Sequence, residues 1–354
     1  MEVKIKLNDM KYRYDVYQMF NIYFPLDEIK FLDDGDYIVN ILEDKVEFKC
    51  NEYYNETKIF ENIKEDIKRL VFSSLKDITK EEYPWGILVG IRPSKIALKY
   101  LEEGKTEEEI IEIFKTKHLA NEEKAKLCIE IAKAEEKFVN KNSNSIAIYI
   151  GMAFCPTRCF YCSFAANPII VNKKLVSPYL EELIREIKAM KKYVNDRKLN
   201  IESVYFGCGT PTAVNNEEFE IVMKEAYEAF VKDKNVKEFT VECGRPDSIT
   251  REKLQTMLNY DVTRISINPQ TMNDDTLKMI GRGHNSNEVI EKFNLARSMG
   301  FNDINMDMII GLPGEGIKEV LHTKEEILKL KPDSLTVHGL SLKRASILYE
   351  NFVL

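Results

Sequence analysis

The sequence lacks long apolar runs, an excess of positive charge and a large share of glycine or proline. No apolar stretch approaches the roughly 18 residues that a membrane-spanning helix requires. The first residues, MEVKIKLNDM, lack the apolar segment of a signal peptide. We therefore expect a cytoplasmic protein without a membrane span.

The charge balance is acidic, with 51 Lys and Arg against 58 Asp and Glu and a net charge of -7. Proteins that bind nucleic acid through its phosphates need the opposite balance, so we expect no nucleic-acid partner. Only 15 Gly and 11 Pro among 354 residues, with 44% hydrophobic residues, are typical of a globular protein. At roughly 150 residues per domain, the length predicts two domains.

Residues 1–140 predict a small α+β accessory domain. Short β-branched and aromatic runs predict strands at 3–7, 37–42 and 46–50, and the pattern becomes helical from about residue 60. One later helix should begin after Asn121, because four apolar residues spaced by four, three and four fall on one face. They are Leu127, Ile131, Ala134 and Phe138.

The polar segment at 141–145, KNSNS, is the best candidate for a linker. After it, strand-like runs alternate with helical patterns, which predicts a parallel sheet. The six runs are 146–150, 202–206, 238–242, 263–267, 303–310 and 334–338. Six such units over 146–345 predict an α/β fold, an incomplete (β/α)6 TIM-like barrel, with its chemistry on the loops that follow the strands.

The helical patterns between these runs have start signals and apolar faces. The pair Ser177 and Pro178 predicts the start of the first barrel helix. A second helix should begin near Asn216 and bury one face. That face consists of Phe219, Val222, Met223, Ala226 and Phe230.

The loop after the first barrel strand contains Cys155, Cys159 and Cys162, with some 14 residues before the predicted helix. Three closely spaced thiolates can hold three irons of a [4Fe-4S] cluster and leave the fourth iron open to another ligand. A structural zinc site is the weaker alternative, because it needs four ligands and no fourth Cys or His lies nearby in the sequence.

This C-x3-C-x2-C motif on the first strand of a six-unit barrel resembles the radical S-adenosylmethionine (SAM) superfamily. The resemblance implies a [4Fe-4S] cluster held by Cys155, Cys159 and Cys162. It also implies that SAM binds the open iron and is cleaved by one electron from the cluster, so the cofactors supply the difficult chemistry. On this view no side chain beyond the cluster ligands need be catalytic.

The second strand ends in FGCGTPT (206–212), where glycines allow a close backbone approach to a ligand. It resembles the GGGTPT loop of the oxygen-independent coproporphyrinogen III oxidase family, with Cys208 at the middle glycine. Phrases such as VECGRPDSI resemble the HemZ-type branch, which also has an N-terminal extension. The positions that match SAM contacts in this family are Tyr149, Tyr161, Cys208, Gly209, Thr210, Glu242, Gln270, Arg282 and Asp307.

The resemblance implies an oxidase that converts two propionates of a porphyrinogen substrate to vinyl groups, with an electron donor such as flavodoxin or ferredoxin. Basic residues should then meet the substrate carboxylates. The candidates are Arg158, Arg245, Lys343 and Arg344. Family members also continue into a helical C-terminal domain, so we expect residues 346–354 to begin a region that is missing.

The alternative is a haem-binding chaperone of the same superfamily. Cys162 is followed by Ser163 and Phe164, an ending shared with haem-chaperone relatives, where authentic oxidases often have C-x-C. Axial haem ligands could come from His284, His322 or His338.

Overall fold

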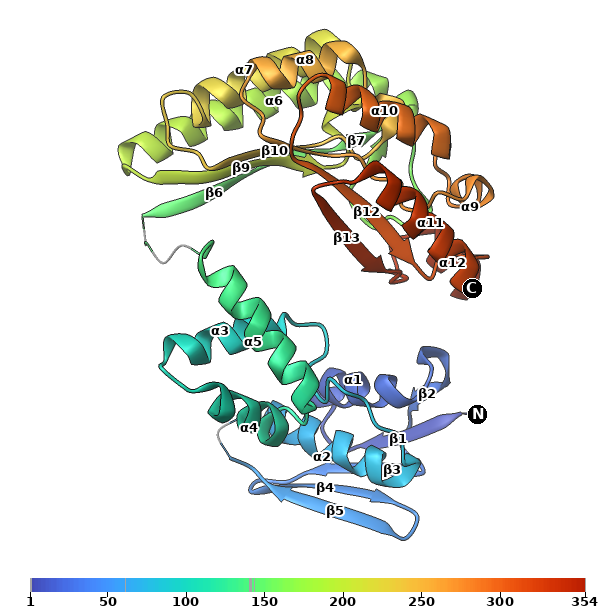
Figure 1. Ribbon diagram of the computed structural model, residues 1–354. Coiled ribbons are helices and arrows are strands. Elements are labelled where there is room, and N and C mark those ends of the chain that lie inside the picture. The colour runs from blue at the N-terminus through green and yellow to red at the C-terminus, as the bar shows by residue number, and fades with distance from the viewer. Residues whose placement is uncertain (1, 61, 140–141, 143, 354) are drawn as a thin grey trace. The chain divides into compact units, whose positions relative to one another are not determined.

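The computed structural model describes residues 2–60, 62–139, 142 and 144–353. The chain divides into two compact units, residues 1–140 and 141–354 (Figure 1). Of the predicted linker at 141–145, residues 141 and 143 lie outside the described residues. No helix in the described part of the chain is long and apolar enough to cross a membrane.

The first unit is built on a five-stranded sheet with the order β2-β1-β3-β4-β5. Its strands are β1 (Val3–Leu7), β2 (Ile29–Phe31), β3 (Tyr37–Ile41), β4 (Lys45–Cys50) and β5 (Tyr53–Lys58). β1 pairs in parallel with β2 and β3, whereas β3, β4 and β5 are antiparallel. The strands predicted at 3–7, 37–42 and 46–50 are confirmed as β1, β3 and β4. β2, which has only three residues, and β5, which is mostly polar, were not predicted from the sequence.

Among the described residues of this α+β unit, five segments are α-helices. They are α1 (Arg13–Tyr23), α2 (Ile63–Thr79), α3 (Pro93–Glu102), α4 (Glu107–Lys117) and α5 (Glu122–Glu136). α1 and α2 share a core with the sheet, which includes Phe20, Phe48 and Ile67. α3, α4 and α5 form a second apolar cluster, which includes Phe114 and Cys128.

The predicted apolar face of α5 is wrong. Leu127 and Ile131 are exposed, and Phe138 lies beyond the end of the helix with 82% of its surface exposed. The buried side chains are Ala125, Cys128, Ile129 and Ala132. Small side chains allow α5 to pack closely against its neighbours α3 and α4, and this contact overrides the position of the larger apolar residues.

The second unit contains a six-stranded parallel sheet with the order β13-β12-β11-β10-β9-β6. Its strands are β6 (Ser145–Met152), β9 (Asn200–Cys208), β10 (Glu238–Glu242), β11 (Arg264–Ser266), β12 (Ile304–Ile310) and β13 (Ser334–Gly339). All six predicted strands are therefore present. β6 and β13 are the two edges, so the sheet is an open barrel of the predicted α/β class (Figure 1).

Helices follow the strands and lie along one side of the curved sheet (Figure 1). They are α6 (Ile169–Asp196), α7 (Asn216–Phe230), α8 (Arg251–Asn259), α9 (Asp274–Met279), α10 (Ser286–Ser298), α11 (Ile317–Leu330) and α12 (Ile347–Val353). Two short strands, β7 (Phe154–Cys155) and β8 (Asn167–Pro168), pair with each other between β6 and α6. The predicted inner face of α7 is confirmed, since all five of its residues are buried.

The predicted start of the first barrel helix at Ser177 is wrong. α6 begins at Ile169, is interrupted at Asn172 by non-helical backbone angles, and contains Pro178 in its interior. A Ser-Pro pair is typical of a helix start because proline has no N–H to donate, but the turns before it are already helical here. The loop after Cys162 is therefore much shorter than predicted.

The packing of α7 on the sheet generates a test of the core. Phe219 is fully buried, whereas Ile221 on the same helix is 53% exposed. We expect Phe219→Ala to lower the free energy of unfolding of the second unit by about 3 to 5 kcal/mol, because it removes a large side chain and leaves a cavity. Ile221→Ala should change it by less than about 0.5 kcal/mol. Circular dichroism in increasing urea measures both, and equal losses would contradict this packing.

Candidate cofactor site

The cysteine-containing loop, residues 155–162, joins β7 to the short segment before β8 and is hydrogen-bonded to the segment that follows α9. The Phe160 backbone N–H donates to the Ile280 carbonyl at 2.9 Å, and the Thr157 hydroxyl donates to the Gly281 carbonyl at 3.2 Å. Gly281 has a φ of 75°, and a Cβ there would lie 2.8 Å from the Phe160 ring. Only glycine allows this approach of the two segments.

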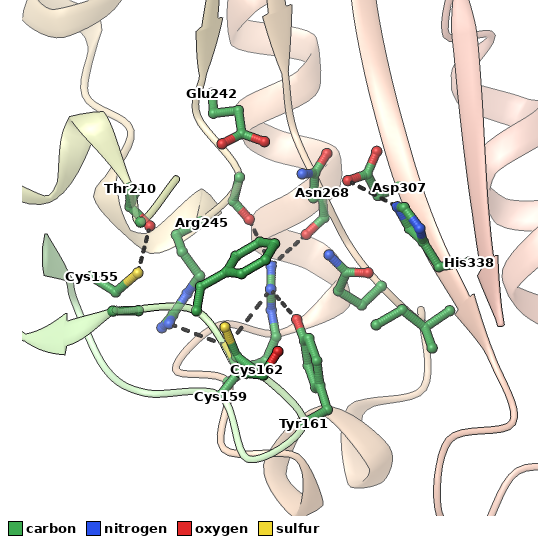
Figure 2. Close-up of a pocket in the computed structure, with 18 of the residues that line it drawn as sticks. Cys155, Cys159, Tyr161, Cys162, Thr210, Glu242, Arg245, Asn268, Asp307 and His338 are labelled. Carbon is green, nitrogen blue, oxygen red and sulfur yellow. Dashed lines mark hydrogen bonds and ion pairs between the residues drawn. The ribbon is translucent and has the colours of Figure 1, made fainter. Parts of the chain in front are cut away.

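Cys155, Cys159 and Cys162 line one pocket of about 410 Å³ at the carboxyl ends of the strands (Figure 2). Burial raises the pKa of the Cys155 thiol to about 11 and also raises the pKa of Cys162. Because burial outweighs the nearby arginine charges, these two thiols are protonated at neutral pH. They therefore need bound metal to become thiolates.

The donor set fits an iron–sulfur cluster better than a single ion. Among the described residues, no three His, Cys, Asp or Glu side chains are placed to hold one metal ion. A [4Fe-4S] cluster needs no such convergence, because each cysteine binds a different iron. Three thiols of one loop that face one pocket meet that requirement.

The turn after β9 is bonded to the cysteine-containing loop. The Gly209 N–H donates to the Met152 carbonyl and the Thr210 N–H to the Phe154 carbonyl, each at 2.8 Å. The Thr210 hydroxyl also lies 3.3 Å from the Cys155 sulfur. A Cβ at Gly209 would lie 2.5 Å from the Phe154 carbonyl oxygen, so this position requires glycine.

Cys208 stands at the position where the resemblance places a glycine. Its φ of 81° lies in the left-handed region, which is unfavourable for a residue with a side chain. The backbone keeps the glycine-like path, and the Cys208 N–H donates to the Glu242 carboxylate at 3.0 Å. Cys208 itself lines the pocket.

The wall opposite the cysteines is polar. Burial raises the pKa of Glu242. Asp307 accepts a hydrogen bond from the Asn305 side-chain amide at 2.7 Å. The side-chain oxygens of Asn268 and Gln270 are buried and have no hydrogen-bond partner. Such acceptors suit the hydroxyl and amino donors of a bound ligand, because an unpartnered buried polar atom is costly.

Two buried arginines lie beside the cysteines. Arg282 donates to the Tyr161 hydroxyl at 3.1 Å, to the Gly244 carbonyl at 2.7 Å and to the Cys159 sulfur at 3.9 Å. Arg245 also reaches the Cys159 sulfur, at 3.8 Å (Figure 2). Neither contact with Cys159 was predicted from the sequence.

Eleven of the twelve residues predicted for the cluster and SAM line this pocket. Tyr149 does not belong to the lining. It lies on β6, 62% exposed, and its ring stacks on Tyr205 at a centroid distance of 5.5 Å. Burial, together with Cys208 and Glu242, raises the pKa of Tyr149 to about 12, so its hydroxyl stays protonated.

The other histidine and basic candidates are placed very differently. His338 and Lys343 line the pocket, whereas His322 is exposed on α11 and Arg344 is exposed outside the lining. His284 is buried, and this burial lowers its pKa to about 2.

Arg158 and Arg245 are engaged by the protein itself. Arg158 donates to the Ala345 carbonyl at 2.7 Å. Arg245 is 3% exposed and forms an ion pair with Asp247. The sequence contained one signal for this pair: Arg245 and Asp247 are two residues apart, directly after a barrel strand.

Comparisons with known proteins agree with this geometry. Residues 149–327 match the family model of the radical SAM superfamily. The chain is 42% identical over 299 residues to the oxygen-independent coproporphyrinogen-III oxidase-like protein HemZ of Bacillus subtilis, covering 84% of this chain and 60% of HemZ. It is 30% identical over 201 residues to the haem chaperone HemW of the same organism, covering 57% of this chain and 52% of HemW.

Among solved structures, coproporphyrinogen III oxidase HemN from Escherichia coli is similar with a TM-score of 0.49 and 22% identity. The match covers 58% of this chain and 51% of that one. The chain thus spans about half to three fifths of the length of these proteins.

The family model covers half of the chain and includes all three cysteines. This match confirms the predicted resemblance to the radical SAM superfamily. The chain therefore belongs to the radical SAM superfamily, whose members use a [4Fe-4S] cluster and SAM, and is similar within it to proteins of the HemZ and HemW kind.

Proposed function

We propose that this protein is an oxygen-independent coproporphyrinogen III oxidase. The observation that carries the proposal is the extent of the likeness to HemZ. The alignment with HemZ covers 84% of this chain. Residues 141–354, the second unit, make up only about three fifths of the chain, so the alignment must continue into the first unit. The likeness to HemW covers 57%.

In the proposed site, Cys155, Cys159 and Cys162 would hold the cluster, in the same pocket that Glu242 and Asp307 line. The bound cluster and SAM supply one-electron radical chemistry. Glu242 and Asp307 would accept hydrogen bonds from the ribose and amino groups of SAM, as would the unpartnered oxygen of Gln270.

The remaining predicted residues would shape the SAM site. Gly209 and Thr210 form the close backbone approach, with Cys208 beside them. Tyr161 and Arg282, bonded to each other, would form the side of the site next to the cluster. Tyr149, stacked on Tyr205, would flank it.

The proposed reaction is balanced as an oxidation. Each propionate would lose carbon dioxide and one hydrogen atom from its β-carbon, which leaves a vinyl group. The 5'-deoxyadenosyl group of SAM would take up the hydrogen atom as 5'-deoxyadenosine, and an external one-electron acceptor would take up the remaining electron. The protein's own contribution would be to position the substrate and to keep water out. Lys343 at the pocket is the remaining basic candidate for a substrate carboxylate, since Arg158 and Arg245 are engaged elsewhere.

The seven free cysteines support the proposed cytoplasmic location, because thiols persist in a reducing compartment. A flavodoxin or ferredoxin is the proposed electron donor.

The cluster assignment is tested by single substitutions. Cys155→Ala, Cys159→Ala and Cys162→Ala should each abolish the brown absorbance and the iron content of anaerobically reconstituted protein, because each removes one ligand. The matched controls Cys50→Ala and Cys128→Ala should retain both, since these cysteines belong to the cores of the first unit. Equal loss from a control would show that the cluster lies elsewhere.

The activity is tested with reduced, reconstituted protein, SAM and coproporphyrinogen III under anaerobic conditions. We expect the substrate to stimulate 5'-deoxyadenosine formation and the decarboxylated porphyrinogen to appear in the same samples by mass spectrometry. Samples of the Cys159→Ala variant should yield neither product. SAM cleavage with no decarboxylated product would refute the oxidase assignment for this chain.

A haem chaperone is the second candidate, favoured by Phe164, which lies at the pocket and is 64% exposed, and by the match to HemW. Of the three candidate ligands, His338 alone lines the pocket. If the chaperone assignment holds, haem should shift its Soret band on binding and His338→Ala should abolish that shift, with the exposed His322→Ala as the control. Absence of any shift in the unmodified protein would exclude this alternative.

A further inference from the structure

Arg245 follows β10, and its guanidinium contacts Thr157 and Cys159 of the cysteine-containing loop. Its side chain is only 4% exposed, so its charge is largely removed from water. A buried cation is costly unless it is paired and all of its donors are used.

Every N–H donor of this guanidinium has an acceptor. Nε and one Nη2 proton bind the Asp247 carboxylate at 3.1 and 2.8 Å in a fork. The second Nη2 proton binds the Thr157 hydroxyl at 3.0 Å, and Nη1 binds the Thr157 carbonyl at 3.1 Å and the Cys159 sulfur at 3.8 Å. An arginine has five such donors, so none is left for a substrate carboxylate.

These contacts distinguish Cys159 from Cys155. Arg245 and Arg282 both donate to its sulfur, and Cys159 is itself 8% exposed. Cys155 instead has the neutral hydroxyl of Thr210 as its partner. Asp247 supplies the negative charge on the far side of the Arg245 guanidinium, and the nearby His284 is neutral because burial lowers its pKa.

Reduction adds one electron to a cluster, and part of that charge resides on the cysteine sulfurs. Hydrogen bonds and positive charges near those sulfurs stabilise the reduced state more than the oxidised state. The effect is large in a buried site, where water screens charges poorly.

We propose that the Arg245–Asp247 pair sets the reduction potential of the cluster through the Cys159 sulfur. Arg245 is a positioning residue that raises the potential, and Asp247 holds it in place and partly offsets its charge. The inference rests on the cluster ligands proposed above and is independent of the substrate, so it holds equally for an oxidase or a chaperone.

The test is an anaerobic redox titration of the full reconstituted chain, without SAM or substrate, followed by electron paramagnetic resonance of the reduced cluster. Arg245→Met should shift the midpoint to a more negative potential. Asp247→Asn should shift it to a more positive one, because the guanidinium keeps its contacts with the loop and loses its counter-charge. At the midpoint of the unmodified protein, we expect the ratio of reduced to oxidised cluster to change about tenfold in each case, which is 59 mV for one electron.

Two further variants separate charge from structural support. Arg245→Lys keeps the charge without the fork and should shift the midpoint less than Arg245→Met. The double variant that combines Arg245→Met with Asp247→Asn should have a midpoint potential between those of the two single variants. A merely structural role predicts no such opposite shifts, and iron and sulfide contents confirm that each variant carries a full cluster.

Unshifted midpoints in fully loaded variants, or shifts of Arg245→Met and Asp247→Asn in the same direction, would overturn the proposal. If Arg245→Met fails to assemble a cluster, the midpoint of Asp247→Asn is the deciding measurement. Absence of a positive shift in that variant would overturn the proposal. Failure of decarboxylation would leave the titration unaffected, so the two proposals fail separately.

Discussion

The parallel pairing of β6 with β9 is the constraint on which the site depends. Its register places Met152 opposite Cys208, so the cysteine-containing loop and the glycine-containing turn leave the sheet at the same edge. The backbone bonds from Gly209 and Thr210 to Met152 and Phe154 then join the two segments. Because all six strands run in parallel, Glu242 at the end of β10 and Asp307 within β12 complete the same pocket.

Electrostatics within this pocket are divided between its two sides. On the cysteine side, burial raises the pKa of the Cys155 thiol, and two buried arginines contact Cys159. On the opposite side, Glu242, Asp307 and unpartnered amide oxygens offer acceptors. One side thus suits a metal cluster with negatively charged sulfurs, and the other suits a ligand with hydroxyl and amino groups.

Much of the fold was predictable because strand and helix patterns in the second unit are regular. All six barrel strands were found, and the buried face of α7 follows from helical periodicity. The errors fall where tertiary contacts override local preference. Pro178 lies inside α6 although Ser-Pro is typical of a helix start, and α5 buries small residues in place of Leu127 and Ile131.

The sequence by itself determined the chemistry that this protein can carry, because the cysteine spacing lies within one loop and short motifs mark the strand ends. Only the tertiary structure decided the contacts of Arg245. Its partners Thr157 and Cys159 lie 88 and 86 residues earlier, and no local pattern shows that a charged side chain at a strand end is buried against them. Only the tertiary structure likewise showed that Tyr149 lies outside the pocket that the other predicted site residues line. Such contacts arise from the parallel register, which brings distant loops to one edge of the sheet.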